Sequence, residues 1–124
     1  LYVIMNPDET FPSSSGGIFP ATGALSATIS VASGCIPVNL GKPGSHLIEM
    51  LKGMTNAPER ALFVGDNLKT DILMGHRCSF RTVFALTGVH KLDDVQRYTQ
   101  STNSEERMCV PDFYANAFSE LVLK

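Results

Sequence analysis

Residues 61–86 read ALFVGDNLKTDILMGHRCSFRTVFAL, and this stretch decides the fold. The apolar residues 61–64 predict a short buried strand, which a Gly-Asp-Asn loop at 65–67 ends. A short helix is expected at 71–75. Residues 82–86 predict a second strand, because β-branched and aromatic side chains favour strands. Continuous apolar strands separated by a helix indicate a parallel sheet.

The alternation of strands and helices continues upstream of this stretch. Residues 1–5 and 38–40 predict two more short strands. Between them, residues 11–23 hold too many Ser, Gly and Pro for regular structure, and a helix capped by Thr22 is expected to end at Gly34. A second helix is expected after residue 44, with its cap and its apolar face at Ser45, Leu47, Ile48, Leu51 and Met54.

Downstream, the same pattern leads to the predicted fold class. Asp93 and Asp94 favour the start of a helix that runs through Tyr98, because acidic side chains stabilise a helix N-terminus. Residues 99–107 predict a polar loop. Residues 113–114 predict an edge strand, and a final helix is expected to carry Phe118, Leu121 and Val122. This order predicts an α/β protein with a doubly wound parallel sheet between helices, a three-layer α/β/α arrangement.

The composition of the chain restricts the kinds of partner that it can bind. The chain has 124 residues, of which 44% are apolar and 18% charged, with a formal net charge of −2. These values predict one small soluble domain. They provide no cationic surface for nucleic acid or anionic lipid. No apolar run approaches the roughly 20 residues of a membrane span. We therefore expect neither nucleic acid nor membrane as a partner.

The cysteines indicate the cellular compartment, and the first residues indicate how the chain begins. Cys35, Cys78 and Cys109 are odd in number and form no Cys-x-x-Cys pair, which is typical of reduced thiols in a cytoplasmic protein. The sequence begins with Leu1 rather than Met, and no leader precedes the first apolar run. We expect this chain to have been cut from something longer.

The candidate site lies where the predicted strands end. Ligands of such sheets bind at the carboxyl ends of the strands, so the informative loops are 6–8, 41–43, 65–71 and 86–88. If their strands are neighbours, Lys42 and Asp66 share one rim of the sheet. A lysine ammonium suits a phosphate, and carboxylates supply the oxygen ligands that Mg²⁺ prefers.

Local sequence leaves two interpretations of these loops open. The Gly-Asp-x-x-x-Thr-Asp pattern at 65–71 fits a metal site, and it equally fits turn and capping chemistry, with Thr70 as a helix cap and Asp71 in the first helical turn. Gly41-Lys42 is no P-loop, because Pro43 occupies the hydroxyl position. The three histidines lack metal-ligand spacing, so we expect structural or solvated roles for His46, His76 and His90.

A family resemblance resolves this choice. The segments that carry it are VGDNLKTDILMG at 64–75, LGKP at 40–43, LTGV at 86–89, and residues 6–8, 22–24, 75–78 and 110–114. In this order and spacing the chain resembles the haloacid dehalogenase (HAD) superfamily. More narrowly, it is similar to the 4-nitrophenylphosphatase branch, which includes phosphoglycolate phosphatase, pyridoxal phosphate phosphatase and NagD-like enzymes.

The resemblance implies roles for particular residues. Lys42 matches the catalytic lysine that steadies the phosphoryl group and the nucleophile. Asp66 matches a Mg²⁺ ligand, and Asp71 matches the catalytic aspartate that supports the metal shell and the lysine. Asn67 lies at a phosphate-binding position where many relatives carry Arg. Phe11 lies in a cap segment that can face the substrate, where the pyridoxal phosphate enzymes carry His, and either substrate specificity or packing within the cap is its expected role.

One part of the family pattern is missing from these 124 residues. The nucleophile and the acid/base aspartate belong to an Asp-x-Asp-Gly-x-Thr motif, and no Asp-x-Asp occurs here. The resemblance therefore implies the C-terminal part of a longer enzyme. Residues 1–36 would be the end of an inserted α/β cap, and residues 37–124 the C-terminal half of the core. It also implies a homodimer formed through the cap.

We therefore expect a Mg²⁺-dependent phosphoric monoester hydrolase in the full-length parent. It would act on small phosphorylated metabolites, of the 4-nitrophenyl phosphate or phosphoglycolate type, through a phospho-aspartyl intermediate. The segment alone is expected to be inactive. The alternative is a non-catalytic binding or scaffold module with the same fold, and the missing nucleophile favours it.

Overall fold

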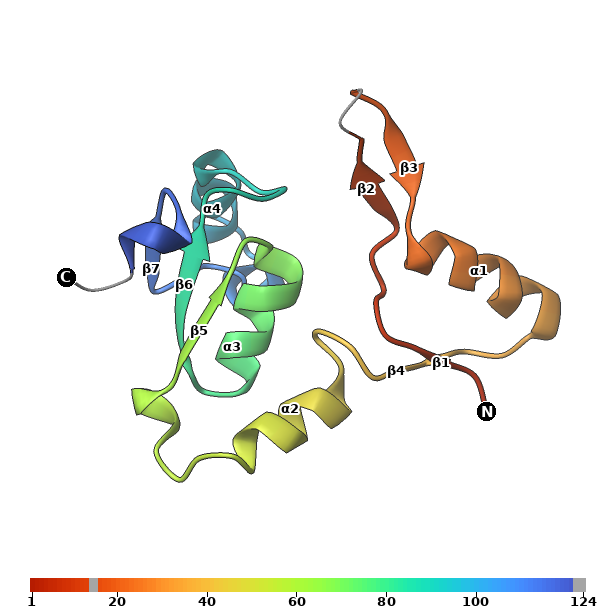
Figure 1. Cartoon of the computed structure of the whole chain (residues 1–124), viewed down its shortest axis with the longest axis horizontal. Helices are drawn as coiled ribbons and strands as arrows, with labels where there is room; N and C mark the ends of the chain where they lie inside the picture. Colours follow the sequence, from red (N-terminus) through yellow and green to blue (C-terminus); the bar gives the residue numbers. More distant parts are fainter. Residues whose placement is uncertain (14–15, 122–124) are drawn as a thin grey trace. The chain divides into compact units, whose positions relative to one another are not determined.

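The computed structural model describes residues 1–13 and 16–121 (Figure 1). The chain forms two compact units, Leu1–Leu47 and Ile48–Lys124, and each is described by itself. The helix α2 (Ser45–Lys52) begins in the first unit and ends in the second. No helix within the described ranges is long and apolar enough to cross a membrane.

The first unit combines a parallel strand pair, a hairpin and one helix. Its elements are β1 (Val3–Ile4), β2 (Thr10–Pro12), β3 (Ile18–Pro20), α1 (Thr22–Ser33) and β4 (Val38–Asn39). β1 and β4 pair in parallel, with Val3 opposite Val38. The hydroxyl of Tyr2 donates to the carbonyl of Ser26 at 3.0 Å, which ties α1 to the residue before β1.

The prediction of an irregular loop at 11–23 is wrong. β2 and β3 form an antiparallel hairpin in which Phe11 lies opposite Phe19. The two rings stack with their centroids 5.8 Å apart. Aromatic pairs across antiparallel strands stabilise a hairpin, and this contact between distant residues outweighs the turn-rich composition.

The end of α1 is as predicted, but its beginning is not. Gly34 ends the helix with a left-handed backbone, φ 68°, which glycine adopts without steric cost. The N-cap is Ala21 rather than Thr22, and it forms no side-chain capping bond. Instead the amide of Gly23 donates to the carbonyl of Asp8 at 2.7 Å, so the backbone of the preceding loop satisfies a group at the helix start.

The second unit is built on a parallel sheet with the strand order β5-β6-β7. Its strands are β5 (Leu62–Gly65), β6 (Arg81–Ala85) and β7 (Phe113–Ala115). Val64 lies opposite Val83, and Val83 opposite Phe113. Parallel strands joined through helices confirm the predicted α/β class, with β7 as the edge strand of this sheet.

Further elements of this unit are short helices and helical turns. They are η1 (Pro58–Arg60), η2 (Leu68–Ile72), α3 (Leu73–Arg77), α4 (Leu92–Thr99), α5 (Ser104–Arg107) and η3 (Phe118–Glu120). The buried cluster consists of Leu68, Ile72, Leu73, Phe84, Tyr98 and Cys109. The segments that follow β5 and β6 therefore share a core.

Three helix predictions need correction. The helix expected at 71–75 is longer, because η2 and α3 together cover 68–77. The expected loop at 99–107 contains α5, whose start is capped by Asn103 accepting from the amide of Glu105 at 2.8 Å. The final helix is reduced to the 3₁₀ turn η3, and Val122 lies outside the described residues.

The helix predicted after residue 44 forms, with a narrower apolar face. Ser45 is its first residue, and Leu47, Ile48 and Leu51 are half-buried. Met54 lies beyond the helix end and is 74% exposed, so it does not belong to that face.

A polar clamp fastens β6 to the segment before β7. Asp112 accepts through Oδ2 from the Thr82 amide at 2.8 Å and from the Thr82 hydroxyl at 3.0 Å. The Asp112 amide donates back to the Thr82 hydroxyl oxygen, and Arg81 donates to Asp112 Oδ1 at 3.2 Å. His76 adds a bond between Nε2 and the carbonyl of Val110 at 2.8 Å, which confirms a structural role for this histidine.

Candidate functional site

The loops that follow β5 and β6 meet at Asp66. The Asp66 side chain lies so close to Gly88 that a Cβ at position 88 would collide with its carboxylate. Asp66 itself is exposed to solvent. The meeting of these two loops is what parallel neighbouring strands predict, because their carboxyl ends lie at the same edge. The sequence pattern predicted that both loops lie at this edge. It did not predict the contact between Asp66 and Gly88.

Asp71 fixes the backbone that carries Asp66. It is 3% exposed, and its Oδ2 accepts from the amides of Asp66 at 3.1 Å and Asn67 at 3.0 Å. A Cβ on Gly65 would overlap the Asp71 carboxylate, so only glycine fits there. Hydrogen bonds from amides stabilise a buried carboxylate, which in turn fixes the loop. Asp71 thus has a supporting position behind Asp66.

Asn67, not Thr70, caps the turn after β5. Its Oδ1 accepts from the Lys69 amide at 3.0 Å, and its carbonyl accepts from the amides of Asp71 at 2.9 Å and Ile72 at 3.2 Å. The bond from Ile72 spans five residues, which makes η2 a π-helical turn. Asn67 has an extended backbone and therefore reaches the turn as an N-cap does. A direct phosphate contact by Asn67 stays a prediction.

His90 supports the same turn from the loop after β6. Its Nδ1 accepts from the amide of Leu68 at 3.3 Å. Burial lowers the pKa of His90 because the charged imidazolium loses hydration, and this outweighs the attraction of the Asp94 carboxylate. A neutral ring is the form that can accept this bond. The expected structural role of His90 is thereby confirmed.

Lys42 follows β4 in the first unit. The amide of Gly41 donates to Asn39 Oδ1 at 2.9 Å, and that of Gly44 donates to the Gly41 carbonyl at 2.6 Å, so the turn closes tightly. The Lys42–Pro43 peptide is cis, and the Lys42 side chain is exposed. Lys42 and Asp66 belong to different units, and their sharing of one rim stays a prediction.

Phe11 borders a hollow in the first unit. The pocket measures about 400 Å³, and its lining includes Asp8, Thr10, Phe11 and Leu25. Phe11 is half-exposed and stacked on Phe19, which leaves part of its ring available to a ligand. The specificity role of Phe11 stays a prediction.

The donor groups at the β5–β6 rim fit Mg²⁺ in part. Asp66 offers an exposed carboxylate, a hard oxygen ligand of the kind that Mg²⁺ takes. The second carboxylate, Asp71, has one oxygen committed to two amides. Across residues 1–13 and 16–121 no three His, Cys, Asp or Glu side chains cluster as a metal site. Asp66 would therefore supply one ligand and require others from outside this set.

The thiols take no part in this arrangement. Cys78 and Cys109 are buried, Cys35 is exposed, and all three are free. Burial raises the pKa of Cys78 and Cys109, because a thiolate would lose its hydration. Free thiols are what the odd cysteine count predicts.

A parallel sheet with helices, and a carboxylate at the carboxyl ends of two adjacent strands, is typical of the α/β proteins that bind their ligands at this edge. Within that class the chain belongs to the HAD-hydrolase-like family, whose model matches residues 39–121. The family resemblance seen in the sequence is therefore confirmed.

One curated relative and two solved structures show what the chain is similar to. Human chronophin is 38% identical over 122 residues, covering 98% of this chain and 40% of chronophin. The structure of glycerol phosphate phosphatase from Mycobacterium tuberculosis in complex with magnesium shares 28% identity with a TM-score of 0.75, over 98% of this chain and 34% of that one. The 4-nitrophenylphosphatase from Thermotoga maritima shares 28% identity with a TM-score of 0.68, over 93% and 41%.

The similarity extends along nearly all of this chain but only part of each relative. The chain spans about 40% of the length of human chronophin. A comparison of the site with these relatives therefore concerns only the part of each relative that this chain matches.

Proposed function

We propose that this chain provides the metal-binding half of the active site of a Mg²⁺-dependent phosphoric monoester hydrolase. The observation that carries the proposal is the exposed Asp66 carboxylate, held where the loops after β5 and β6 meet. Asp71 supports this interpretation, because it fixes the backbone of Asp66 and Asn67 through two amides. The phosphatase names of two similar solved structures support the same reaction class.

The chemistry assigns separate tasks to the chain's residues. When bound, Mg²⁺ would supply positive charge to stabilise the phosphoryl group. Asp66 would hold it, and Asp71 would keep Asp66 in place. Lys42 would offset negative charge on the non-bridging phosphoryl oxygens. The attacking carboxylate, which forms and later loses the phospho-aspartyl bond, would come from outside these 124 residues.

The proposed substrates are small phosphomonoesters. The names of two neighbours, a 4-nitrophenylphosphatase and a glycerol phosphate phosphatase, support compact phosphorylated molecules. In the first unit, Phe11 would present an apolar surface to the non-phosphate part of the substrate. We therefore propose 4-nitrophenyl phosphate and phosphoglycolate-like esters as the first compounds to assay.

The test uses the full-length protein that carries this sequence. Asp66→Asn and Lys42→Ala should each lower turnover of 4-nitrophenyl phosphate by orders of magnitude, with unchanged circular dichroism spectra. The matched controls are Asp93→Asn and Lys52→Ala, both at exposed positions. Retained activity in either site variant would contradict the assignment. The isolated 124 residues should show no turnover, and measurable hydrolysis by them would contradict the need for an external nucleophile.

The same assay separates the enzyme from the alternative, a binding or scaffold module. The absence of Asp-x-Asp from these residues favours the alternative. An Asp-x-Asp-Gly-x-Thr motif elsewhere in the full-length protein, together with magnesium-dependent turnover, favours the enzyme. A full-length protein without the motif and without turnover would leave the module as the better account.

A further inference from the structure

Side chains accept from the amides that follow β5, and one of these side chains comes from another loop. The amides of Asp66 and Asn67 donate to Asp71 Oδ2 at 3.1 and 3.0 Å. The next amide, that of Leu68, donates to His90 Nδ1 at 3.3 Å. Asp71 belongs to the turn itself, whereas His90 lies in the loop after β6. His90 therefore ties the turn after β5 to the loop of the neighbouring strand.

The peptide that joins Asn67 to Leu68 is hydrogen-bonded at both ends. Its N–H donates to His90, and its carbonyl accepts from the amides of Asp71 at 2.9 Å and Ile72 at 3.2 Å. Those two amides close the π-helical turn η2, whose first residue is Leu68. A rotation of this peptide would move its carbonyl away from both amides and its N–H away from His90. His90 thus orients the peptide on which the turn is built.

Two routes lead from His90 to the Asp66 carboxylate. In the first, the peptide that His90 orients holds the amide of Asp71, and the Asp71 carboxylate holds the amide of Asp66. In the second, the loop of His90 lies against Asp66 at Gly88, where no Cβ would fit. Lys91 keeps that loop closed, because its ammonium donates to the Gly88 carbonyl at 3.1 Å. The bond to His90 therefore couples the position of Asp66 to both loops.

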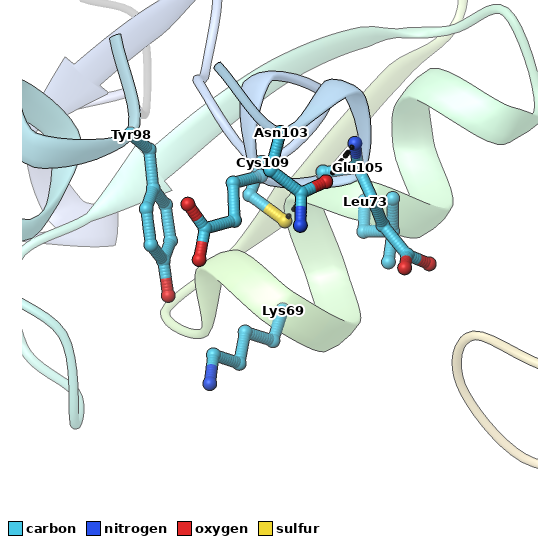
Figure 2. A pocket seen from close by; sticks show the side chains of 7 residues that line it. Lys69, Leu73, Tyr98, Asn103, Glu105 and Cys109 are labelled. Atoms are coloured by element: carbon cyan, nitrogen blue, oxygen red, sulfur yellow. Dashed lines mark hydrogen bonds between the residues drawn. The ribbon is translucent and has the colours of Figure 1, made fainter. Parts of the chain in front are cut away.

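The far end of the same turn is held by packing instead. Leu73, which follows η2, belongs to one buried cluster with Tyr98 and Cys109, and Figure 2 shows Cys109 between these two side chains. The Leu68 side chain is part of the same cluster. Packing restricts the position of a side chain but not the angle of the adjoining N–H, whereas a hydrogen bond restricts that angle. His90 supplies this directional restraint at the start of the turn.

The acceptor nitrogen determines which tautomer His90 adopts. An amide N–H is always a donor, so Nδ1 accepts and carries no proton, and the neutral ring holds its proton on Nε2. Burial lowers the pKa of the imidazole, which favours this neutral form. The contact with Leu68 therefore requires the Nε2–H tautomer, which nitrogen-15 NMR can identify.

We propose that His90 is a positioning residue for the metal ligand Asp66, an inference that rests on the proposed function. His90 acts through the Leu68 amide rather than on the metal itself. Groups that orient a metal ligand typically contribute roughly 10–100-fold to metal affinity. We expect an effect of about tenfold, the lower end of this range, because His90 acts through the backbone and not on the Asp66 carboxylate.

The test measures Mg²⁺ binding by the full-length protein in a calorimeter, with two variants of matched shape. At the place of His Nδ1, Asn carries an oxygen acceptor and Leu carries a methyl group. His90→Leu should weaken Mg²⁺ affinity about tenfold, whereas His90→Asn should bind close to the wild type because it keeps an acceptor. His46→Leu, at an exposed position in α2, is the control and should leave the affinity unchanged. Circular dichroism checks that each variant folds.

Two results of this comparison overturn the inference. The first is equal Mg²⁺ affinity of His90→Leu and the wild type, and the second is an equal loss in His90→Leu and His90→Asn. Asp66→Asn in the same series separates this failure from that of the proposed function. If Asp66→Asn loses affinity and His90→Leu does not, only the role of His90 fails. If Asp66→Asn binds as the wild type does, or the wild type binds no Mg²⁺, the proposed function fails and the inference with it.

A second measurement needs neither metal nor variant. Nitrogen-15 NMR of the metal-free full-length protein at about pH 8, above the ordinary pKa of histidine, reports which ring nitrogen of His90 carries the proton. We expect the proton on Nε2, with Nδ1 free to accept from Leu68. This spectrum keeps the inference open to refutation if a variant does not fold. A proton on Nδ1 overturns it.

Discussion

The glycine turns after β4 and β5 are held in two different ways. At Gly41, the backbone carbonyl of Met5 occupies the place that a Cβ would take. At Gly65, that place is occupied by the carboxylate of Asp71, a buried side chain that also binds two amides of the turn. The first turn therefore depends on the backbone of another segment, and the second on one side chain. Only the second can be relaxed or disrupted by changing a single side chain.

The largest effect is expected from adding a methyl group to either turn. Gly65→Ala and Gly41→Ala should each lower the free energy of unfolding by about 1–3 kcal/mol, because each Cβ enters occupied space. Combining Gly65→Ala with Asp71→Ala should cost clearly less than the sum of the single changes, since the second removes the obstacle. Urea denaturation measures these energies.

The control for this cycle is Gly53→Ala, where a Cβ meets nothing closer than 3.4 Å. It should leave the stability nearly unchanged. Strict additivity of the Gly65 and Asp71 substitutions would show that the carboxylate does not hold the turn.

A smaller effect separates the two candidate caps of η2. Asn67→Ala should destabilise the protein by about 1 kcal/mol, because the Lys69 amide loses its acceptor. Thr70→Ala is expected to change stability by less than about 0.5 kcal/mol, since the cap is Asn67. Thermal or urea unfolding of the two variants provides the comparison. A larger loss at Thr70 than at Asn67 would reverse the assignment of the cap.

The smallest effect concerns pH and the clamp between β6 and β7. Burial raises the pKa of Asp112, but bonds from the Thr82 amide and hydroxyl and from Arg81 outweigh it, so the folded-state pKa is lowered. A lowered pKa adds stability that is fully present above the unfolded value of about 3.9 and is lost as the pH falls through the folded-state pKa.

The check on the clamp compares the wild type with Asp112→Asn. The stability advantage of the wild type should be constant from about pH 7 to pH 5 and should shrink below about pH 4. Urea denaturation at each pH measures it. An advantage that grows on acidification would contradict the lowered pKa.

Sequence patterns predicted the elements whose signals are local. The strands around Phe63 and Val83 are continuous apolar runs, and Gly34 marks the end of α1. The position of Asp66 at a strand end followed from the same pattern. These features depend on neighbouring residues along the chain, which a sequence displays directly.

The missed features depend on contacts between segments. The hairpin of β2 and β3 is stabilised by Phe11 against Phe19, a pairing that turn-rich composition conceals. The choice of Asn67 over Thr70 follows from the π-helical turn, which no spacing rule anticipates. Gly88 against Asp66 and His90 against Leu68 join loops about twenty residues apart, as neighbouring parallel strands require.

The most direct test of the central claim is Mg²⁺ binding by the full-length protein, measured by calorimetry for the wild type, Asp66→Asn and Asp93→Asn. If Asp66 is a metal ligand, Asp66→Asn should weaken Mg²⁺ affinity about tenfold or more, with unchanged stability. Asp93→Asn, at an exposed helix start, should bind as the wild type does. Equal Mg²⁺ affinity in all three proteins would contradict the assignment of Asp66 and, with it, the proposed phosphatase site.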